Sequence, residues 1–208
     1  METAIDEFRK ALEANAPEFG IALETDRIER LINYYKLVMK WNERLHLVAP
    51  CSAAEFAVRH VLESLILLKH LPLSAMVVDV GSGGGLPIIP CLFVRDDLRA
   101  ILIESSKRKG VFLREALRAV TPPDRAQLIP ARFEDIEKPE ADFVTCRALD
   151  RFSAILPALI DWAPGNAILL LFAGESIRNQ VQTILGSVTV ERIPLSERRF
   201  LLIARAIN

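Results

Sequence analysis

The sequence contains few cysteines and has no large excess of charge of either sign. Its 208 residues include three cysteines, Cys51, Cys91 and Cys146, which are far apart and lack a CxxC spacing. A disulfide framework or a zinc site is therefore not expected, and buried, reduced thiols are predicted. The formal net charge is −1, whereas many nucleic-acid-binding domains are strongly basic. Any contact with RNA must therefore use local basic patches.

Long apolar runs are also missing. The longest run, residues 167–173, is much shorter than a membrane-spanning helix and predicts a buried strand. Residues 1–7 are acidic and lack an apolar stretch, so we expect no secretion signal. These absences predict a cytoplasmic protein without membrane contact, of a size that suits one domain with a small appendage.

The first part of the chain has the spacing of helices. Asp26 with Glu29 and Ser52 with Glu55 each match a capping box, and apolar side chains recur at helical intervals behind both pairs. A proline at position 72 would end the last helix. We therefore predict an N-terminal helical cap over residues 1–72.

From residue 73 to residue 208, short apolar runs alternate with longer mixed segments. Strands are predicted at 76–80, 101–104, 127–130, 142–145 and 168–172, and helices at 86–94, 107–120, 152–161 and 177–185. Apolar strands that alternate with helices indicate parallel βαβ units in a sheet covered on both faces. Residues 188–193 and 200–204 predict a closing antiparallel pair.

A glycine-rich turn follows the first predicted strand. Residues 79–87 have the sequence Asp-Val-Gly-Ser-Gly-Gly-Gly-Leu-Pro. Glycines let the backbone approach a ligand, and the N–H groups of the following helix point toward it. Dinucleotides place a pyrophosphate on such a turn, whereas S-adenosylmethionine places its methionine moiety there. Asp79 favours S-adenosylmethionine, because a carboxylate attracts its amino group and repels a pyrophosphate; a tight turn without a ligand is the structural alternative.

Residues at the next two strand ends extend this predicted site. Glu104 ends the second strand about twenty residues after the glycines, where a carboxylate accepts hydrogen bonds from ribose hydroxyls. NAD-binding proteins share this feature, so Glu104 indicates a nucleoside without distinguishing the cofactors. Phe133 would flank an adenine and Glu134 or a backbone N–H would contact its edge; packing of Phe133 in the core is an equal alternative.

Several motifs together point to one family. They are Lys40-Trp41-Asn42, residues 59–64 (Arg-His-Val-Leu-Glu-Ser), the glycine turn, Glu104-Ser105 with Lys107-Arg108-Lys109, Arg147-Ala148 and Glu197-Arg198. From about residue 25 onward the chain resembles the bacterial small-subunit (16S) ribosomal RNA guanine-N7 methyltransferases, also called the glucose-inhibited division protein B family (RsmG, GidB). The resemblance implies a class I S-adenosylmethionine-dependent methyltransferase fold, Rossmann-like with a seven-stranded, mostly parallel sheet, behind the helical cap.

The expected site combines cofactor, catalytic and RNA-binding residues. The cofactor-binding residues are expected to be Asp79, Gly81, Ser82, Gly83, Gly85, Leu86, Glu104, Ser105, Phe133, Glu134 and Arg147. Arg147 is also the expected catalytic residue, since it would direct the base through guanine O6 and leave N7 free; a strand-end salt bridge is the alternative. The residues expected to contact RNA are Arg59, His60, Lys107, Arg108, Arg198 and Arg199. Packing of His60 between cap and domain, and a merely solvated basic surface, are the alternatives.

The substrate side of the predicted site departs from the family pattern. His46, Val48, Ile88, Cys146 and Ala173 stand where the family usually has Asn, Thr, Gly, Ser and Lys. The leading hypothesis is methylation of guanine N7 in small-subunit ribosomal RNA by a monomer. A methyltransferase with another substrate, or a non-catalytic S-adenosylmethionine-binding protein on the ribosome, remain alternatives. A nicotinamide oxidoreductase is disfavoured by Asp79 and by the lack of a paired Tyr-Lys or His-Asp motif.

Overall fold

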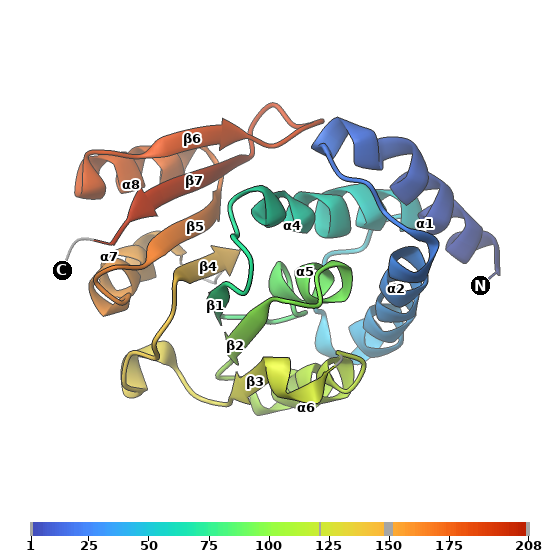
Figure 1. Cartoon of the computed structure of the whole chain (residues 1–208), viewed down its shortest axis with the longest axis horizontal. Coiled ribbons are helices and arrows are strands. Elements are labelled where there is room, and N and C mark those ends of the chain that lie inside the picture. Colours follow the sequence, from blue (N-terminus) through green and yellow to red (C-terminus); the bar gives the residue numbers. More distant parts are fainter. Residues whose placement is uncertain (1, 121, 148–151, 207–208) are drawn as a thin grey trace.

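The computed structural model describes residues 2–120, 122–147 and 152–206. Within these residues, seven strands form one sheet in the order β3-β2-β1-β4-β5-β7-β6 (Figure 1). The strands are β1 (Met76–Val80), β2 (Arg99–Ile103), β3 (Ala126–Ile129), β4 (Phe143–Arg147), β5 (Ile168–Ala173), β6 (Thr189–Arg192) and β7 (Phe200–Arg205). β7 pairs antiparallel with β5 and β6, and all other neighbours are parallel. The predicted parallel sheet and its closing antiparallel pair are therefore confirmed.

Helices cover both faces of the sheet. They are α1 (Glu2–Asn15), α2 (Thr25–Leu45), α3 (Ala53–Phe56), α4 (Glu63–Leu65), α5 (Ile88–Val94), α6 (Lys107–Leu117), α7 (Phe152–Trp162) and α8 (Glu175–Leu185). Side chains of β1 alternate between two buried clusters: Val77 packs with α5, α6 and the cap, whereas Val78 and Val80 pack with α7 and α8. This alternation is the two-residue period of a strand buried on both faces.

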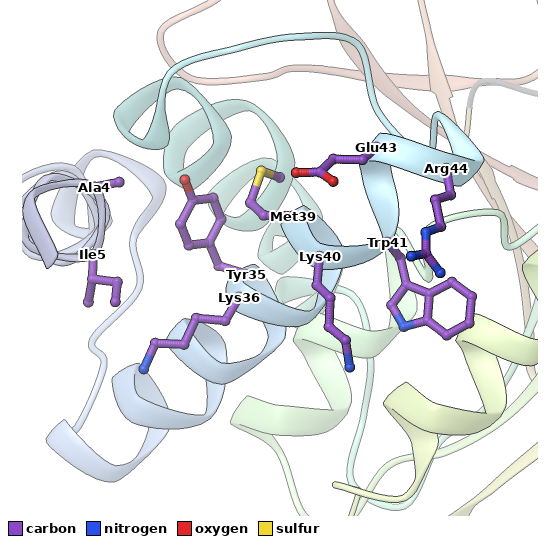
Figure 2. A pocket seen from close by; sticks show the side chains of 9 residues that line it. All are labelled: Ala4, Ile5, Tyr35, Lys36, Met39, Lys40, Trp41, Glu43 and Arg44. Atoms are coloured by element: carbon purple, nitrogen blue, oxygen red, sulfur yellow. The ribbon is translucent and has the colours of Figure 1, made fainter. Parts of the chain in front are cut away.

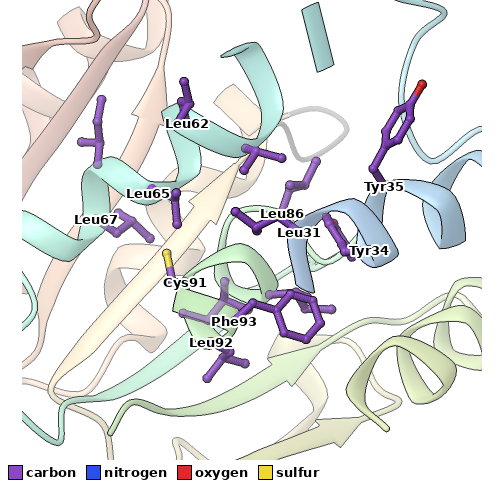
Figure 3. Close-up of a cluster of buried hydrophobic side chains, with 14 of the residues drawn as sticks. Leu31, Tyr34, Tyr35, Leu62, Leu65, Leu67, Leu86, Cys91, Leu92 and Phe93 are labelled. Carbon is purple, nitrogen blue, oxygen red and sulfur yellow. The ribbon is translucent and has the colours of Figure 1, made fainter. Parts of the chain in front are cut away.

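The cap docks onto the sheet through a continuous apolar core. Leu62, Leu65 and Leu67 lie beside Cys91 and Phe93 of α5 in one cluster of buried side chains (Figure 3). Figure 1 shows the cap helices gathered next to α5, on the side away from α7 and α8. Because this core is shared, the position of the cap is fixed relative to the strand ends.

One of the two predicted helix caps is confirmed and the other is wrong. Ser52 caps α3, and its Oγ accepts a hydrogen bond from the Glu55 N–H at 3.1 Å. α2 instead begins at Thr25 after an extended Glu24, so Asp26 lies within the first turn. The Asp26 carboxylate is 3.4 Å from Nε of Arg27, which uses it as an ion-pair partner instead of a cap.

Two further observations bear on the predictions from composition. Cys91 and Cys146 are buried, but Cys51 is partly exposed, and none of the three forms a disulfide. No helix in the described part of the chain has the length and apolar character needed to cross a bilayer.

Candidate active site

The glycine turn between β1 and α5 has a backbone conformation that other residues rarely adopt. Gly81, Gly83 and Gly85 have φ values of 72°, 52° and 82°. A Cβ on Gly85 would also lie 2.4 Å from Cδ1 and 2.9 Å from Cγ1 of Ile89, a buried core residue. Glycine is therefore required at position 85 by both backbone geometry and packing.

Glu104 holds this turn from the neighbouring strand. The Gly83 N–H donates to Glu104 Oε2 at 2.8 Å, and the Ser106 N–H donates to Oε1 at 2.7 Å. Both carboxylate oxygens are thus oriented by the backbone, and each retains further acceptor capacity. The arrangement suits a carboxylate that accepts hydrogen bonds from a pair of hydroxyls.

A cavity of about 500 Å³ opens over the turn, beyond the carboxyl ends of β1, β2 and β4. Its lining residues come from the cap, the turn and three later segments: Leu47, Val48, Ala49, His60, Gly81, Ser82, Gly83, Gly84, Leu86, Glu104, Ser105, Ser106, Lys109, Arg147 and Ile155. Ligands of open α/β folds bind at this edge of the sheet. The structure therefore brings most of the predicted cofactor residues together around one cavity.

Asp79 lies behind the turn and not on the cavity wall. Its side chain is fully buried, and neither carboxylate oxygen makes a hydrogen bond in the structure. Burial raises the pKa of Asp79 from 3.8 to about 8; a contact with Ser82 opposes this shift and the charge of Glu104 adds to it. An uncompensated buried carboxylate is costly, so a cationic ligand in the cavity would favour the ionised form of Asp79 through its charge.

Phe133 and Glu134 do not line this cavity. The Phe133 ring packs against the Trp162 ring in an edge-on arrangement, with centroids 5.5 Å apart. The Glu134 carboxylate lies 3.7 Å from the Arg132 guanidinium near the surface. Contact of Phe133 and Glu134 with an adenine therefore remains a prediction.

A loop from the cap forms the roof of the cavity. The Asn42 side chain accepts a hydrogen bond from the Val48 N–H at 2.9 Å and donates to the Val48 carbonyl at 3.1 Å. Leu47 is thereby held against the glycine turn, where a Cβ on Gly84 would lie 3.5 Å from Leu47 Cβ. The indole N–H of the adjacent Trp41 donates to Glu115 on α6 at 3.0 Å. The Trp-Asn motif thus has a structural explanation: it fixes the loop around Leu47, which could not be predicted from the motif alone.

Tyr34 connects the cap directly to the glycine turn and was not among the predicted site residues. Its hydroxyl donates to the Gly84 carbonyl at 2.5 Å, and its side chain is buried. Burial, together with the charge of Asp79, raises the pKa of Tyr34. The phenol therefore stays protonated and remains a hydrogen-bond donor.

Replacing Tyr34 with phenylalanine is expected to weaken S-adenosylmethionine binding about fivefold, because a buried hydrogen bond contributes about 1 kcal/mol. Tyr35→Phe is the matched control, since the neighbouring ring stacks on Phe8 with centroids 4.6 Å apart and does not reach the turn. Titration calorimetry on both variants would measure the difference. Equal affinities would show that the turn keeps its geometry without Tyr34.

Arg147 reaches the cavity from the end of β4 and is held on several sides. It donates to Ser64 Oγ at 3.2 Å, to the Arg59 carbonyl at 2.5 Å and to Glu63 Oε2 at 3.1 Å. Its guanidinium carbon also lies 5.2 Å from the centroid of the Phe172 ring. Ala148, its partner in the family motif, lies outside the described residues.

His60 lies on the cavity wall with a buried, unpartnered Nδ1. Burial and, to a smaller extent, repulsion from Arg147, Arg59 and Arg199 together lower the pKa of His60 to about 3. The imidazole is therefore neutral at physiological pH.

The other residues predicted to contact RNA fall into two groups. Lys107, Arg108 and Arg198 are exposed. Arg59 forms an ion pair with Glu55, and Arg199 points inward, with its guanidinium 2.6 Å from Glu63 Oε1. The first group is available to a polyanion, whereas the half-buried Arg199 is committed to an ion pair with the buried Glu63.

The departures from the family pattern are compatible with the cavity. Ile88 is buried in the core and does not narrow the opening. Cys146 and Ala173 are also buried within β4 and β5. His46 ends α2 in the left-handed conformation (φ 48°), which Asn and His adopt more readily than most residues. Val48 still forms part of the roof.

A second, larger hollow of about 690 Å³ lies on the cap. Figure 2 shows Ala4 and Ile5 of α1 on one side and Lys36, Lys40 and Arg44 of α2 extending beside it. This hollow contains neither a glycine turn nor strand ends. It therefore lacks the features that suit a nucleoside ligand.

The sheet order and the turn at the end of β1 define the class I methyltransferase fold. Solved structures show the same fold: precorrin-6y C5,15-methyltransferase of Geobacter metallireducens (TM-score 0.52, 15% identity, 69% of this chain and 87% of that one). The TYW2 protein of M. jannaschii in complex with AdoMet gives a TM-score of 0.51 at 16% identity, over 69% of this chain and 71% of that one.

Sequence comparison defines the family within this class. The model of the family GidB, rRNA small subunit methyltransferase G, matches residues 27–201, and the chain belongs to this family. The ribosomal RNA small subunit methyltransferase G of Halorhodospira halophila is 29% identical over 190 residues, which cover 89% of this chain and 90% of the relative. The protein of the same name from Xanthomonas campestris is 36% identical over 136 residues, 65% of this chain and 63% of the relative.

Proposed function

We propose that the protein is a cytoplasmic, monomeric enzyme that transfers a methyl group from S-adenosylmethionine to N7 of a guanine in small-subunit ribosomal RNA. The observation that carries the proposal is the cavity over the glycine turn, in which Glu104 and Arg147 face a common space. Its volume falls in the range of small-ligand sites, roughly 300–1,000 Å³. Family membership connects this cavity with ribosomal RNA.

The residues around the turn fit the proposed cofactor. Backbone groups from Gly81 to Leu86 would hold the methionine moiety, and Glu104 would accept hydrogen bonds from the ribose. The buried carboxyl group of Asp79 lacks a hydrogen-bond partner, and the positively charged ligand would favour its ionised form. A dinucleotide would instead bring its pyrophosphate toward two carboxylates.

Methyl transfer to N7 needs little acid-base chemistry from the protein. When bound, the cofactor supplies an electrophilic methyl group: its bond to sulfur breaks as a bond to N7 forms, and the positive charge passes from sulfur to the base. N7 carries a lone pair and no proton, so a general base is not required. The rate would depend on positioning and electrostatics, with Arg147 donating to O6 and the neutral His60 adding no further positive charge.

The direct test is transfer of a labelled methyl group to purified small ribosomal subunits, followed by mass spectrometry of the nucleosides. The proposal expects N7-methylguanine at one site. Calorimetry would measure binding of S-adenosylmethionine and of NAD to the same protein. Cofactor binding without incorporation would favour the non-catalytic alternative, and incorporation only into another acceptor would favour a different substrate.

Arg108 provides a test of RNA contact at the mouth of the cavity. It is exposed in the first turn of α6, next to Lys109, which lines the cavity. Arg108→Glu is expected to lower affinity for the small subunit about fivefold to tenfold and to reduce the salt slope by about 1, as for one lost phosphate contact. The change should leave S-adenosylmethionine affinity unaltered.

Arg99→Glu is the matched control, because Arg99 is also exposed but begins β2, at the end of the strand that lies away from the cavity. Filter binding over a range of salt concentrations would compare the two variants. An equal loss in both would mean that only overall charge matters and that α6 does not face the RNA.

A further inference from the structure

A single buried carboxylate joins three parts of the fold beside the cavity. Glu63 begins α4 in the cap and is 1% exposed. Its Oε2 lies 3.1 Å from the guanidinium of Arg147 at the end of β4, and its Oε1 lies 2.6 Å from that of Arg199, just before β7. No other acidic residue in the described ranges forms an ion pair with either arginine.

We propose that Glu63 is a positioning residue for methyl transfer, which fixes the guanidinium of Arg147 at the cavity wall and holds Arg199 beside it. The proposal rests on the proposed function and assigns a role to a residue that lies in one of the family motifs but was not among the predicted site residues. Glu63 does not line the cavity, so its effect passes through Arg147.

The geometry around Arg147 supports this role. A guanidinium has five N–H donors in a rigid plane, and the contacts of Arg147 with Ser64, the Arg59 carbonyl and Glu63 together fix that plane. Of these partners only Glu63 carries a charge. The Arg59 carbonyl belongs to a π-helical segment, Ala57–Leu62, whose irregular hydrogen bonding is common at functional sites.

The negative charge of Glu63 would also act on the guanine in the cavity. Arg59, Arg147 and Arg199 are all close enough to lower the pKa of His60, so three guanidinium groups lie near the substrate side of the cavity. The methylated guanine is itself cationic. A carboxylate between two of these arginines would lower the electrostatic cost of placing that charge beside them.

A purely structural cross-link between the cap and the antiparallel β6–β7 pair is the competing explanation, and the chain contains a suitable control. Glu191 on β6 joins the same two parts of the fold: it lies 2.8 Å from His70 Nε2 and 3.4 Å from Lys69 Nζ. None of these three residues lines the cavity. Glu63 and Glu191 therefore share the cross-linking role; they differ in contact with Arg147 and in burial, with side chains 2% and 28% exposed.

The test compares Glu63→Gln with Glu191→Gln in steady-state methylation of small ribosomal subunits. Loss of one partner from a buried ion pair predicts a fall in kcat of about 100-fold for Glu63→Gln, with KM for the subunit changed less than about threefold. Glu63→Asp keeps the charge but shortens its reach, so its kcat should fall only about tenfold. Glu191→Gln should keep kcat within about twofold.

Two further measurements make each outcome decisive. Thermal unfolding would show whether Glu63→Gln folds. If it does not, Glu63→Asp is compared with Glu191→Asp instead, and kcat of Glu63→Asp should be about tenfold lower. S-adenosylmethionine affinity should fall about fivefold in Glu63→Gln and not in Glu191→Gln, and this comparison holds even if the wild-type protein methylates no ribosomal RNA. Equal kcat and affinity in the two variants would overturn the proposal and leave Glu63 as a cross-link.

Discussion

Replacing Asp79 with asparagine should weaken S-adenosylmethionine binding about 100-fold to 1,000-fold while stabilising the unliganded protein. The carboxyl group is fully buried without a hydrogen-bond partner, so folding near pH 7 requires it either to bind a proton or to stay ionised at a cost, and asparagine should stabilise the fold by about 1–3 kcal/mol. The same change removes the negative charge that balances a cationic ligand. Opposite effects on stability and affinity would distinguish a binding residue from a core residue.

Because the pKa of Asp79 is raised, both the stability of the protein and its affinity for the ligand should depend on pH. The value rises from 3.8 to about 8 in the folded protein, so the folded state binds more protons than the unfolded state between these values. The stability of the unliganded protein should therefore decrease as pH rises from about 4 to 8. A cationic ligand favours the ionised carboxylate, so affinity should increase between pH 6 and 8, with proton release near pH 7.

Calorimetry in buffers of different ionisation enthalpy would measure the protons released, and thermal unfolding would measure stability. Asp142→Asn serves as the control, because Asp142 is an exposed aspartate that accepts from the Met76 N–H at 2.8 Å, at the opposite end of β1. It should leave both affinity and proton release unchanged. Tight binding by Asp79→Asn, or an unaltered pH profile, would contradict the assigned role of Asp79.

Gly85→Ala should abolish measurable S-adenosylmethionine binding and destabilise the protein by about 2–5 kcal/mol. The φ of 82° is unfavourable for alanine, and the new Cβ would lie 2.4 Å from Ile89 Cδ1 and 3.3 Å from Ile89 Cβ. Because Ile89 is buried, its side chain cannot move away, and the turn itself must shift. Such a shift would displace the neighbouring N–H of Gly83 from Glu104.

Gly110→Ala is the contrasting variant for this experiment. Gly110 lies inside α6, and a Cβ there would lie 3.8 Å from Leu128 Cδ2, which is ordinary contact. Alanine should therefore stabilise the protein by up to about 1 kcal/mol without changing affinity. Thermal unfolding and calorimetry on both variants would check the pair; a neutral Gly85→Ala would show that the turn tolerates rearrangement.

Local patterns were sufficient to predict the sheet and the cavity residues at the ends of its parallel strands. β1 and the start of β7 coincide with the predicted segments because short apolar runs between turns leave few alternative registers. Gly81 and Glu104 could be placed because strand ends in a parallel sheet meet at one edge. The predicted N-terminal capping residue of α2, Asp26, was wrong because its carboxylate pairs with Arg27 within the same helix, and spacing alone does not reveal such a pair.

The substrate side of the site could not be predicted in the same way. Tyr34, Leu47 and Glu63 come from the cap, and their contacts depend on how that cap packs on the sheet. Arg199 belongs to a basic pair in the sequence, yet only one member of the pair turns inward. Such choices follow from long-range packing, to which neither periodicity nor motif spacing is sensitive.

The roof and floor of the cavity come from different parts of the chain. Leu47 and the Asn42 clamp belong to the cap, whereas the glycine turn below them follows β1. Ligand occupancy and cap docking must then share a coupling free energy, which is reciprocal: whatever a ligand adds to cap attachment, cap attachment adds to ligand affinity. A partner that binds α2 and shifts the cap would thereby change the affinity for the cofactor without contacting the cavity.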